Sequence, residues 1–127
     1  MQPVIYAVGD IHGEADRLKR LHNHIFEHHA LAHTDTPLII VHLGDYVDRG
    51  PDSCHVIDYL QALQGPEGAQ IINLKGNHEA MMLDALLRNE SKTMWLNNGG
   101  DATMESYQSA GYDTVPDSHL DLSLIHI

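Results

Sequence analysis

The sequence predicts an α/β fold, because strand-like and helix-like segments alternate along it. Three short runs rich in apolar and β-branched residues span 4–8, 38–41 and 70–75. A glycine follows each run within three residues, and Asp or Asn comes directly after that glycine. The segments between the runs carry apolar residues at helical spacing. Strands that alternate with helices are typical of right-handed β-α-β units in an α/β sheet.

The expected elements follow one another in a regular order. A strand over 3–8 precedes a helix over 14–32, and the strand at 38–41 precedes a helix that begins at Pro51 and reaches about residue 64. Asp52 or Ser53 is expected to cap that second helix. The third strand leads into a helix over 78–89, and a last short helix covers 101–108.

The first helix carries an unusual number of histidines. Leu18, Leu21 and Ile25 lie at helical spacing and are expected to face the core. The other face carries four histidines, with His33 just beyond, and it is interpreted as a solvated surface: His22, His24, His28 and His29. No third ligand is evident nearby, so these residues are left out of the predicted site.

The composition indicates one soluble domain and excludes two classes of partner. The chain has 127 residues, and its formal net charge is 7 − 18 = −11. This charge argues against nucleic acid and against anionic membranes as partners. The single cysteine, Cys54, permits no internal disulfide, as expected in a reducing compartment. No signal peptide or membrane-spanning run is evident, so a cytoplasmic location is expected.

Charged side chains follow the second strand closely. Asp45, Asp48 and Arg49 lie on one loop after a glycine that allows a sharp turn. Carboxylates at the carboxyl end of a buried strand lie where open α/β sheets bind ligands. Two carboxylates and a guanidinium on one loop suit a metal ion together with a phosphate.

The same arrangement recurs after the other two strands. Asp10 and His12 follow the first strand, and Asn77 and His78 follow the third. Side chains of these types, if they converge from neighbouring strand ends, form a mixed oxygen and nitrogen site for divalent metals. One such element alone would be weak evidence, but three in one small chain indicate a metal site.

These motifs resemble those of a known family. Residues 9–13 (GDIHG), 44–50 (GDYVDRG) and 76–79 (GNHE) match the three amino-terminal motifs of the PPP, or calcineurin-like, metallophosphoesterases. Residues 95–100 (WLNNGG) resemble a further block of the bacterial and phage protein phosphatases in that family. The resemblance implies two mixed β-sheets between helical layers, of which this chain would hold the amino-terminal half.

The resemblance also implies two divalent metal ions. Asp10 and His12 are expected to hold the first metal, and Asn77 the second, while Asp45 bridges both. Mn²⁺ is the expected ion, and Fe or Zn would also suit these ligands. Such a pair of metals activates a water for attack on the phosphorus atom.

The remaining motif residues are expected to act on the phosphate ester. The resemblance implies that His78 protonates the leaving oxygen and that Asp48 orients His78 through a hydrogen bond. Arg49 is expected to hold the phosphate with its planar guanidinium. Glu79 is expected to support the loop or the start of the helix, and Asn98 and Gly99 to shape the edge of the site.

The chain is expected to be an amino-terminal fragment of such an enzyme. The second metal of the family needs two further histidines, and a second phosphate-binding arginine is also usual. Residues 122–127 (LSLIHI) match the in-frame translation of a transposon-end adapter used in library sequencing. We therefore expect residues 1–121 to be part of one metallophosphoesterase domain and 122–127 to be a non-native tail, so that His126 is not the missing ligand.

The predicted function is that of a metal-dependent phosphomonoesterase of the serine/threonine protein phosphatase type. Its substrates would be phosphorylated proteins or small phosphoesters. A symmetric diadenosine tetraphosphate hydrolase is the alternative enzyme, although Asp48 and Glu79 favour the phosphatase. For the 127-residue chain itself, an inactive metal-binding module is the alternative.

Overall fold

Three parallel strands form the sheet at the centre of the fold. The computed structural model describes residues 2–33 and 35–124. The strands are β1 (Val4–Val8), β2 (Leu38–His42) and β3 (Gln70–Asn73), paired in the order β1-β2-β3. Parallel pairing brings all three carboxyl ends to one edge of the sheet, so the α/β prediction is confirmed.

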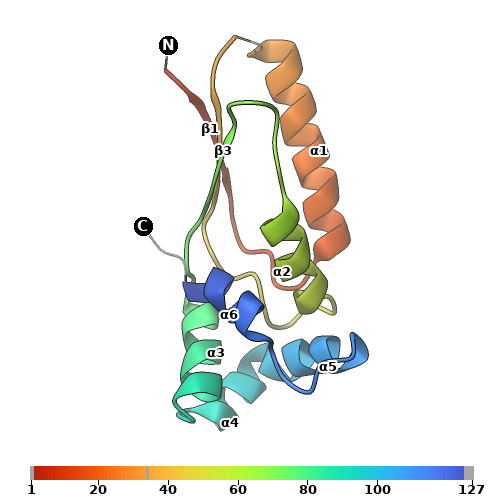
Figure 1. The fold of residues 1–127 in the computed structure, drawn as a ribbon, viewed down its shortest axis with the longest axis vertical. Helices are drawn as coiled ribbons and strands as arrows, with labels where there is room; N and C mark the ends of the chain where they lie inside the picture. The colour runs from red at the N-terminus through yellow and green to blue at the C-terminus, as the bar shows by residue number, and fades with distance from the viewer. Residues whose placement is uncertain (1, 34, 125–127) are drawn as a thin grey trace.

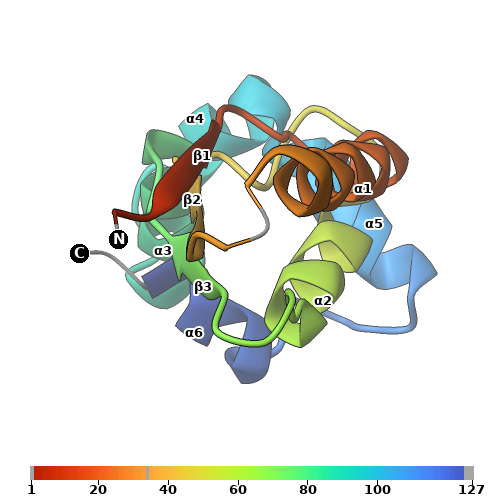
Figure 2. The same cartoon turned by 90° about the horizontal axis from the view of Figure 1, so that it is seen from above.

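The helices fall into two groups (Figures 1 and 2). One group, α1 (Ala15–Ala32) and α2 (Ser53–Ala62), runs along one face of the sheet. The second group gathers beyond the carboxyl ends of the strands, at the lower end of Figure 1. It comprises α3 (Asn77–Leu87), α4 (Lys92–Trp95), a kinked segment η1 (Leu96–Gly100), α5 (Asp101–Ser109) and α6 (Asp117–Leu124).

The start of α2 differs from the prediction. The helix begins at Ser53, two residues after Pro51, and Asp52 is its N-cap without a side-chain hydrogen bond. Asp52 therefore occupies the expected N-cap position but makes no capping hydrogen bond. Ser53 is fully buried, and its hydroxyl accepts the backbone N–H of Asp48 at 3.1 Å, so it supports the loop between β2 and α2, called the central loop below.

The two faces of the sheet have different surroundings. The face toward α1 and α2 buries Ile40 of β2 against residues such as Leu18 and Val56. The alternate residues point to the opposite face, where Ile5 is 60% exposed and Ile39 is only partly buried. A partly exposed face that is mostly apolar is unusual for a parallel sheet, which is ordinarily covered on both sides.

The interpretation of the α1 histidines is wrong for two of them. His22 is fully buried and His29 nearly so, whereas His24 and His28 are exposed as expected. Leu21, expected to face the core, is 42% exposed. The inward stripe of α1 is therefore rotated toward the histidines.

The two buried histidines have polar partners, which explains how they tolerate burial. The His22 ring meets the Tyr59 hydroxyl at 2.8 Å and His42 Nε2 at 2.9 Å. His29 Nε2 donates to the carbonyl oxygen of Thr36 at 2.7 Å. A buried imidazole is acceptable where its nitrogen atoms are hydrogen-bonded in this way.

Within residues 2–33 and 35–124, none of the helices is both long and apolar enough to span a bilayer. His126, which was excluded as a metal ligand, and the end of the predicted tail at 125–127 lie outside the described residues.

Candidate active site and metal centre

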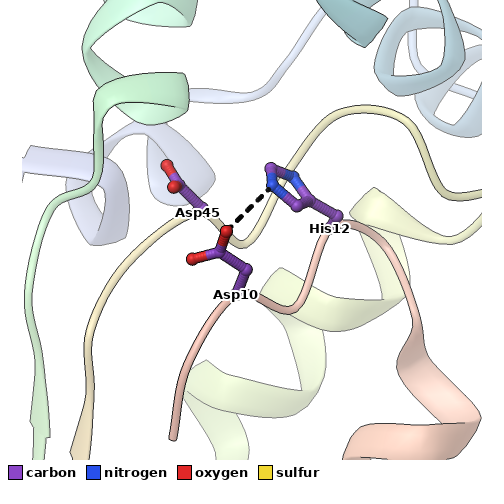
Figure 3. Close-up of side chains that lie close together, drawn as sticks. All are labelled: Asp10, His12 and Asp45. Carbon is purple, nitrogen blue, oxygen red and sulfur yellow. Dashed lines mark ion pairs between the residues drawn. The ribbon is translucent and has the colours of Figure 1, made fainter.

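The loops after β1 and β2 bring three potential metal ligands together (Figure 3). One ligand atom each from Asp10, His12 and Asp45 lies within 4.8 Å of the others. Two backbone hydrogen bonds fix this arrangement, because the N–H groups of Ile11 and His12 both donate to the Asp45 carbonyl, at 3.0 and 2.9 Å. The predicted convergence of these residues is therefore present in the structure.

The orientation of the His12 ring suits metal binding. Its Nδ1 lies 2.8 Å from the carbonyl oxygen of Val47, so Nδ1 carries the proton and donates it. The lone pair of a neutral ring is then on Nε2, which lies 3.6 Å from Asp10 Oδ2. Such a second hydrogen bond commonly fixes the tautomer of metal-ligating histidines.

This set of donors fits a divalent metal ion. Two carboxylates and one neutral imidazole supply oxygen and nitrogen ligands, which suit Mn²⁺, Fe²⁺ and Zn²⁺. Asp10 is 66% exposed in its side chain, so an ion could reach the cluster from solvent. The residues Asp10, His12 and Asp45 would hold that ion.

Asn77 lies against the same cluster from the start of α3. Its amide oxygen faces the Asp45 carboxylate, and turning the amide over would instead let its nitrogen donate to both carboxylate oxygens at 3.0 Å. Without a cation, the second orientation is preferred because oxygen would otherwise face oxygen. An ion shared by Asp45 and Asn77 would reverse that preference, as the expected second metal requires.

Two glycines allow the loops after β2 and β3 to touch. Gly44 has φ +108°, and a Cβ there would lie 2.4 Å from the backbone nitrogen of Gly76. A Cβ on Gly76 would lie 2.3 Å from Asp45 Oδ1. Since real Cβ atoms do not approach so closely, any side chain at either position would push Asp45 away from Asn77.

Glu79 holds the backbone of these loops, as predicted. Its fully buried carboxylate accepts N–H groups from Gly76, Asp45, Tyr46 and Val47, at 2.6 to 3.3 Å. Burial raises the pKa of this carboxyl, and the four backbone hydrogen bonds oppose that rise. Glu79 therefore joins the loop after β2 to the start of α3 and does not belong to the ligand cluster.

Backbone strain is concentrated at this site. The non-glycine residues with positive φ include four from the two loops: His12 (42°), Asp45 (58°), Asp48 (77°) and Arg49 (72°). Each such conformation costs on the order of 1–3 kcal/mol. The hydrogen bonds from Glu79 and between the loops offset this cost, and the result is that the polar side chains point to one place.

Asp48 and His78 form a buried pair beside the ligand cluster. His78 Nδ1 lies 2.8 Å from Asp48 Oδ2, and both side chains are at most 5% exposed. The backbone N–H of His78 donates to Asp45 Oδ1 at 3.0 Å. The rings of His12 and His78 meet edge to face, with centroids 4.6 Å apart. The predicted hydrogen bond between Asp48 and His78 is thus present.

Arg49 lies at the edge of this arrangement. Its side chain is exposed, and it lines an adjoining cleft of about 430 Å³ together with Asp52 and Glu105. Among the described residues, no ion pair joins its guanidinium to a carboxylate. The guanidinium is therefore available to a ligand, although the structure does not bring it into the cluster itself.

Three further residues contact Asp48 that sequence reasoning did not assign to it. Trp95 and Thr103 donate to its carboxylate, and the Ser53 hydroxyl accepts its backbone N–H. Burial raises the pKa of Asp48, and hydrogen bonds from Thr103, His78 and Trp95 oppose that rise. The WLNNGG block pointed to Trp95, but nothing in the sequence pointed to Thr103.

Comparison with known proteins agrees with this geometry. Residues 3–123 match the model of the calcineurin-like phosphoesterase family. Over 98 residues, which make up 76% of this chain, it is 41% identical to serine/threonine-protein phosphatase 2 of Escherichia coli, covering 38% of that protein. It is 39% identical over 98 residues to serine/threonine-protein phosphatase 1 of Salmonella typhimurium, covering 76% of this chain and 39% of that protein.

A solved structure shows the same fold. A crystal structure described as a "putative diadenosine tetraphosphatase" superposes on 95% of this chain and 42% of its own, with a TM-score of 0.53 and 25% identity. The chain spans about two fifths of the length of the relatives it matches. The family match covers nearly all of the residues, and the chain therefore belongs to the calcineurin-like phosphoesterase family.

Proposed function

We propose that residues 1–121 are the amino-terminal part of a metal-dependent phosphoprotein phosphatase, which hydrolyses phosphoserine or phosphothreonine esters. The observation that carries the proposal is the contact between the ligand cluster and the Asp48–His78 pair. A proton donor beside a metal site, with its ring held by a buried carboxylate, suits hydrolysis of a phosphomonoester. The two bacterial protein phosphatases at about 40% identity support this choice of substrate.

The proposed roles rest on the chemistry of each side chain and, for His78, on its position beside Asp48. His78 holds its Nδ1 proton against Asp48, so a second proton taken up by the ring sits on Nε2, and it is this proton that passes to the departing alcohol oxygen. Arg49 binds phosphoryl oxygens through its guanidinium, whose charge also favours the extra negative charge of the transition state.

Divalent metals, when bound, supply an activated water and neutralise charge on the phosphate. Asp10, His12 and Asp45 would hold the first ion, and Asp45 with Asn77 would contribute to the second. Mn²⁺ is the proposed ion. Two protein ligands are too few for tight binding of the second ion, so we propose that its remaining ligands, and a second arginine, lie in a longer protein that contains residues 1–121.

Two further expectations remain proposals. Residues 122–127 are proposed to be a non-native tail rather than part of the domain. A cytoplasmic location is proposed from the single cysteine, Cys54, which is buried in the core and has no disulfide partner.

The test is hydrolysis by the longer protein with Mn²⁺, using a phosphoserine peptide, p-nitrophenyl phosphate and diadenosine tetraphosphate. We expect turnover of the peptide, and a loss of about 100-fold or more in the variant His78→Asn. His24→Asn, an exposed change, is the matched control and should keep full activity. Absence of turnover on all three substrates would contradict the proposal.

The alternative substrate is diadenosine tetraphosphate, which the solved structure's description favours. The same assay separates the two, because a symmetric hydrolase would cleave the dinucleotide and leave the phosphopeptide intact. The Asp48–His78 pair and Glu79 resemble the protein phosphatases more closely, so the peptide is the expected substrate.

A further inference from the structure

Asp48 is a fully buried carboxylate with an unusually complete set of donors. His78 Nδ1 lies 2.8 Å from Oδ2, and Trp95 Nε1 donates to Oδ2 and Oδ1 at 2.9 and 3.0 Å. The Thr103 hydroxyl donates to Oδ1 at 2.7 Å and accepts the backbone N–H of Asp48 at 2.8 Å. Among the described residues no lysine or arginine pairs with this carboxylate, so an imidazole, an indole and a hydroxyl hold it in place.

We propose that Trp95 and Thr103 are positioning residues, which hold Asp48 so that it keeps the His78 proton on Nδ1 and directs Nε2 toward the substrate. This inference rests on the proposed function of His78. Neither residue needs to touch the substrate, because both are fully buried. A buried carboxylate without these two donors would be free to rotate or to take up a proton, and either change would release the imidazole.

The chain between the two residues is shaped to deliver both donors. Gly100 leaves room for the Trp95 ring, since a Cβ there would lie 2.5 Å from that ring. The carbonyl oxygen of Gly99 accepts the backbone N–H of Arg49 at 3.1 Å, which joins η1 to the central loop. The kink in η1, at Asn98 and Gly99, then lets α5 begin at an angle that brings Thr103 to Asp48.

The same contacts explain the WLNNGG block physically. Trp95 supplies the N–H, the paired glycines allow the close approach, and Thr103 lies in the first turn of α5. Ser53 completes the arrangement from α2, since its hydroxyl lies 3.2 Å from that of Thr103. The block thus supports the Asp48–His78 pair.

The first test uses the 127-residue chain and the nitrogen chemical shifts of the His78 ring. In the neutral ring of the wild type we expect the single proton on Nδ1. The variants Trp95→Phe and Thr103→Val each remove one donor with little change of shape, and both should raise the share of neutral rings whose single proton lies on Nε2 instead of Nδ1. Thr103→Ser keeps the hydroxyl and should restore the wild-type pattern.

A matched control separates positioning from packing. Tyr107→Phe also removes a fully buried hydroxyl from α5, but that hydroxyl bonds to His119 and not to Asp48. Tyr107→Phe should lower the melting temperature without changing which nitrogen of the His78 ring carries the proton. If Trp95→Phe fails to fold, the Thr103 pair of variants still decides the question. If the nitrogen chemical shifts of the His78 ring in Thr103→Val match those of the wild type, the inference is overturned.

The second test measures catalysis in the longer protein. Trp95→Phe and Thr103→Val should each lower kcat by about tenfold and leave KM within about twofold, with a larger loss on an alkyl phosphate than on p-nitrophenyl phosphate. Equal losses on the two substrates would overturn the inference. If the longer wild-type protein hydrolyses none of the substrates while the chemical shifts of the His78 ring change as expected in the variants, the positioning role of Trp95 and Thr103 is supported and the proposed function is refuted.

Discussion

Acidification should unfold the chain partly through one residue, His22. This ring is fully buried between α1 and the sheet, beside His42 and Tyr59. Burial, followed by the proximity of His42, lowers the pKa of His22 from 6.5 to about 4. The folded state therefore prefers the neutral ring, whereas the unfolded chain takes up a proton near pH 6.5.

The sign and size of the effect follow from this difference in pKa. The stability that depends on a neutral His22 ring is fully present above pH 6.5, and it is lost as the pH drops from 6.5 to about 4. A difference of about 2.5 pKa units corresponds to about 3 kcal/mol. That is a large share of the roughly 5–15 kcal/mol by which domains of this size are stable.

The assay is urea unfolding of the 127-residue chain at several values between pH 7 and pH 4. His22→Leu removes the titrating group, so its stability should fall by about 3 kcal/mol less than that of the wild type over this range. At pH 7 the variant itself should be less stable, because the Tyr59 hydroxyl loses its partner.

His24→Gln, an exposed change on the same helix, should leave the pH dependence unaltered. Parallel curves for the wild type and His22→Leu would refute the reasoning, since they would mean that the buried ring does not resist protonation.

Three further predictions concern the site and the exposed sheet face. Glu79→Gln points an amide at backbone N–H groups, so it should lower the free energy of unfolding, measured with urea, by about 3–5 kcal/mol. The exposed change Glu105→Gln should alter that free energy by no more than about 0.5 kcal/mol, and equal effects of the two variants would mean that Glu79 does not support the loops. Arg49→Lys should lower kcat/KM of the longer protein at least about tenfold, or roughly 1.4 kcal/mol, and wild-type activity would remove Arg49 from the site. Calorimetric titration of the 127-residue chain should show one tightly bound Mn²⁺, and the variant Asp10→Asn should lose that binding. The chain should also show negligible phosphatase activity and tend to aggregate through the sheet face around Ile5. Two tight Mn²⁺ sites together with turnover would contradict this prediction.

Local patterns predicted the three strands, the helices α1, α2, α3 and α5, and most of the candidate site, but they missed the short helix α4 and the helix α6 that follows α5. The helix expected over 14–32 spans Ala15–Ala32, and the three strands lie where the apolar runs predicted them. Because parallel strands end at one edge, residues that follow each strand had to meet there. The cluster of Asp10, His12 and Asp45 lies at that edge as expected, and the backbone of the two loops, with positive φ at His12 and Asp45, completes it.

Tertiary structure decided which polar groups are buried and what holds them. Helical spacing defines a stripe of residues, but histidine is compatible with water and with a core, so the sequence could not place His22 against His42. Trp95 and Thr103 reach Asp48 across 47 and 55 residues, and no local period encodes such contacts. These contacts form only when α4 and α5 pack against the loop after β2, because the donors of a buried carboxylate are the groups that the fold brings next to it.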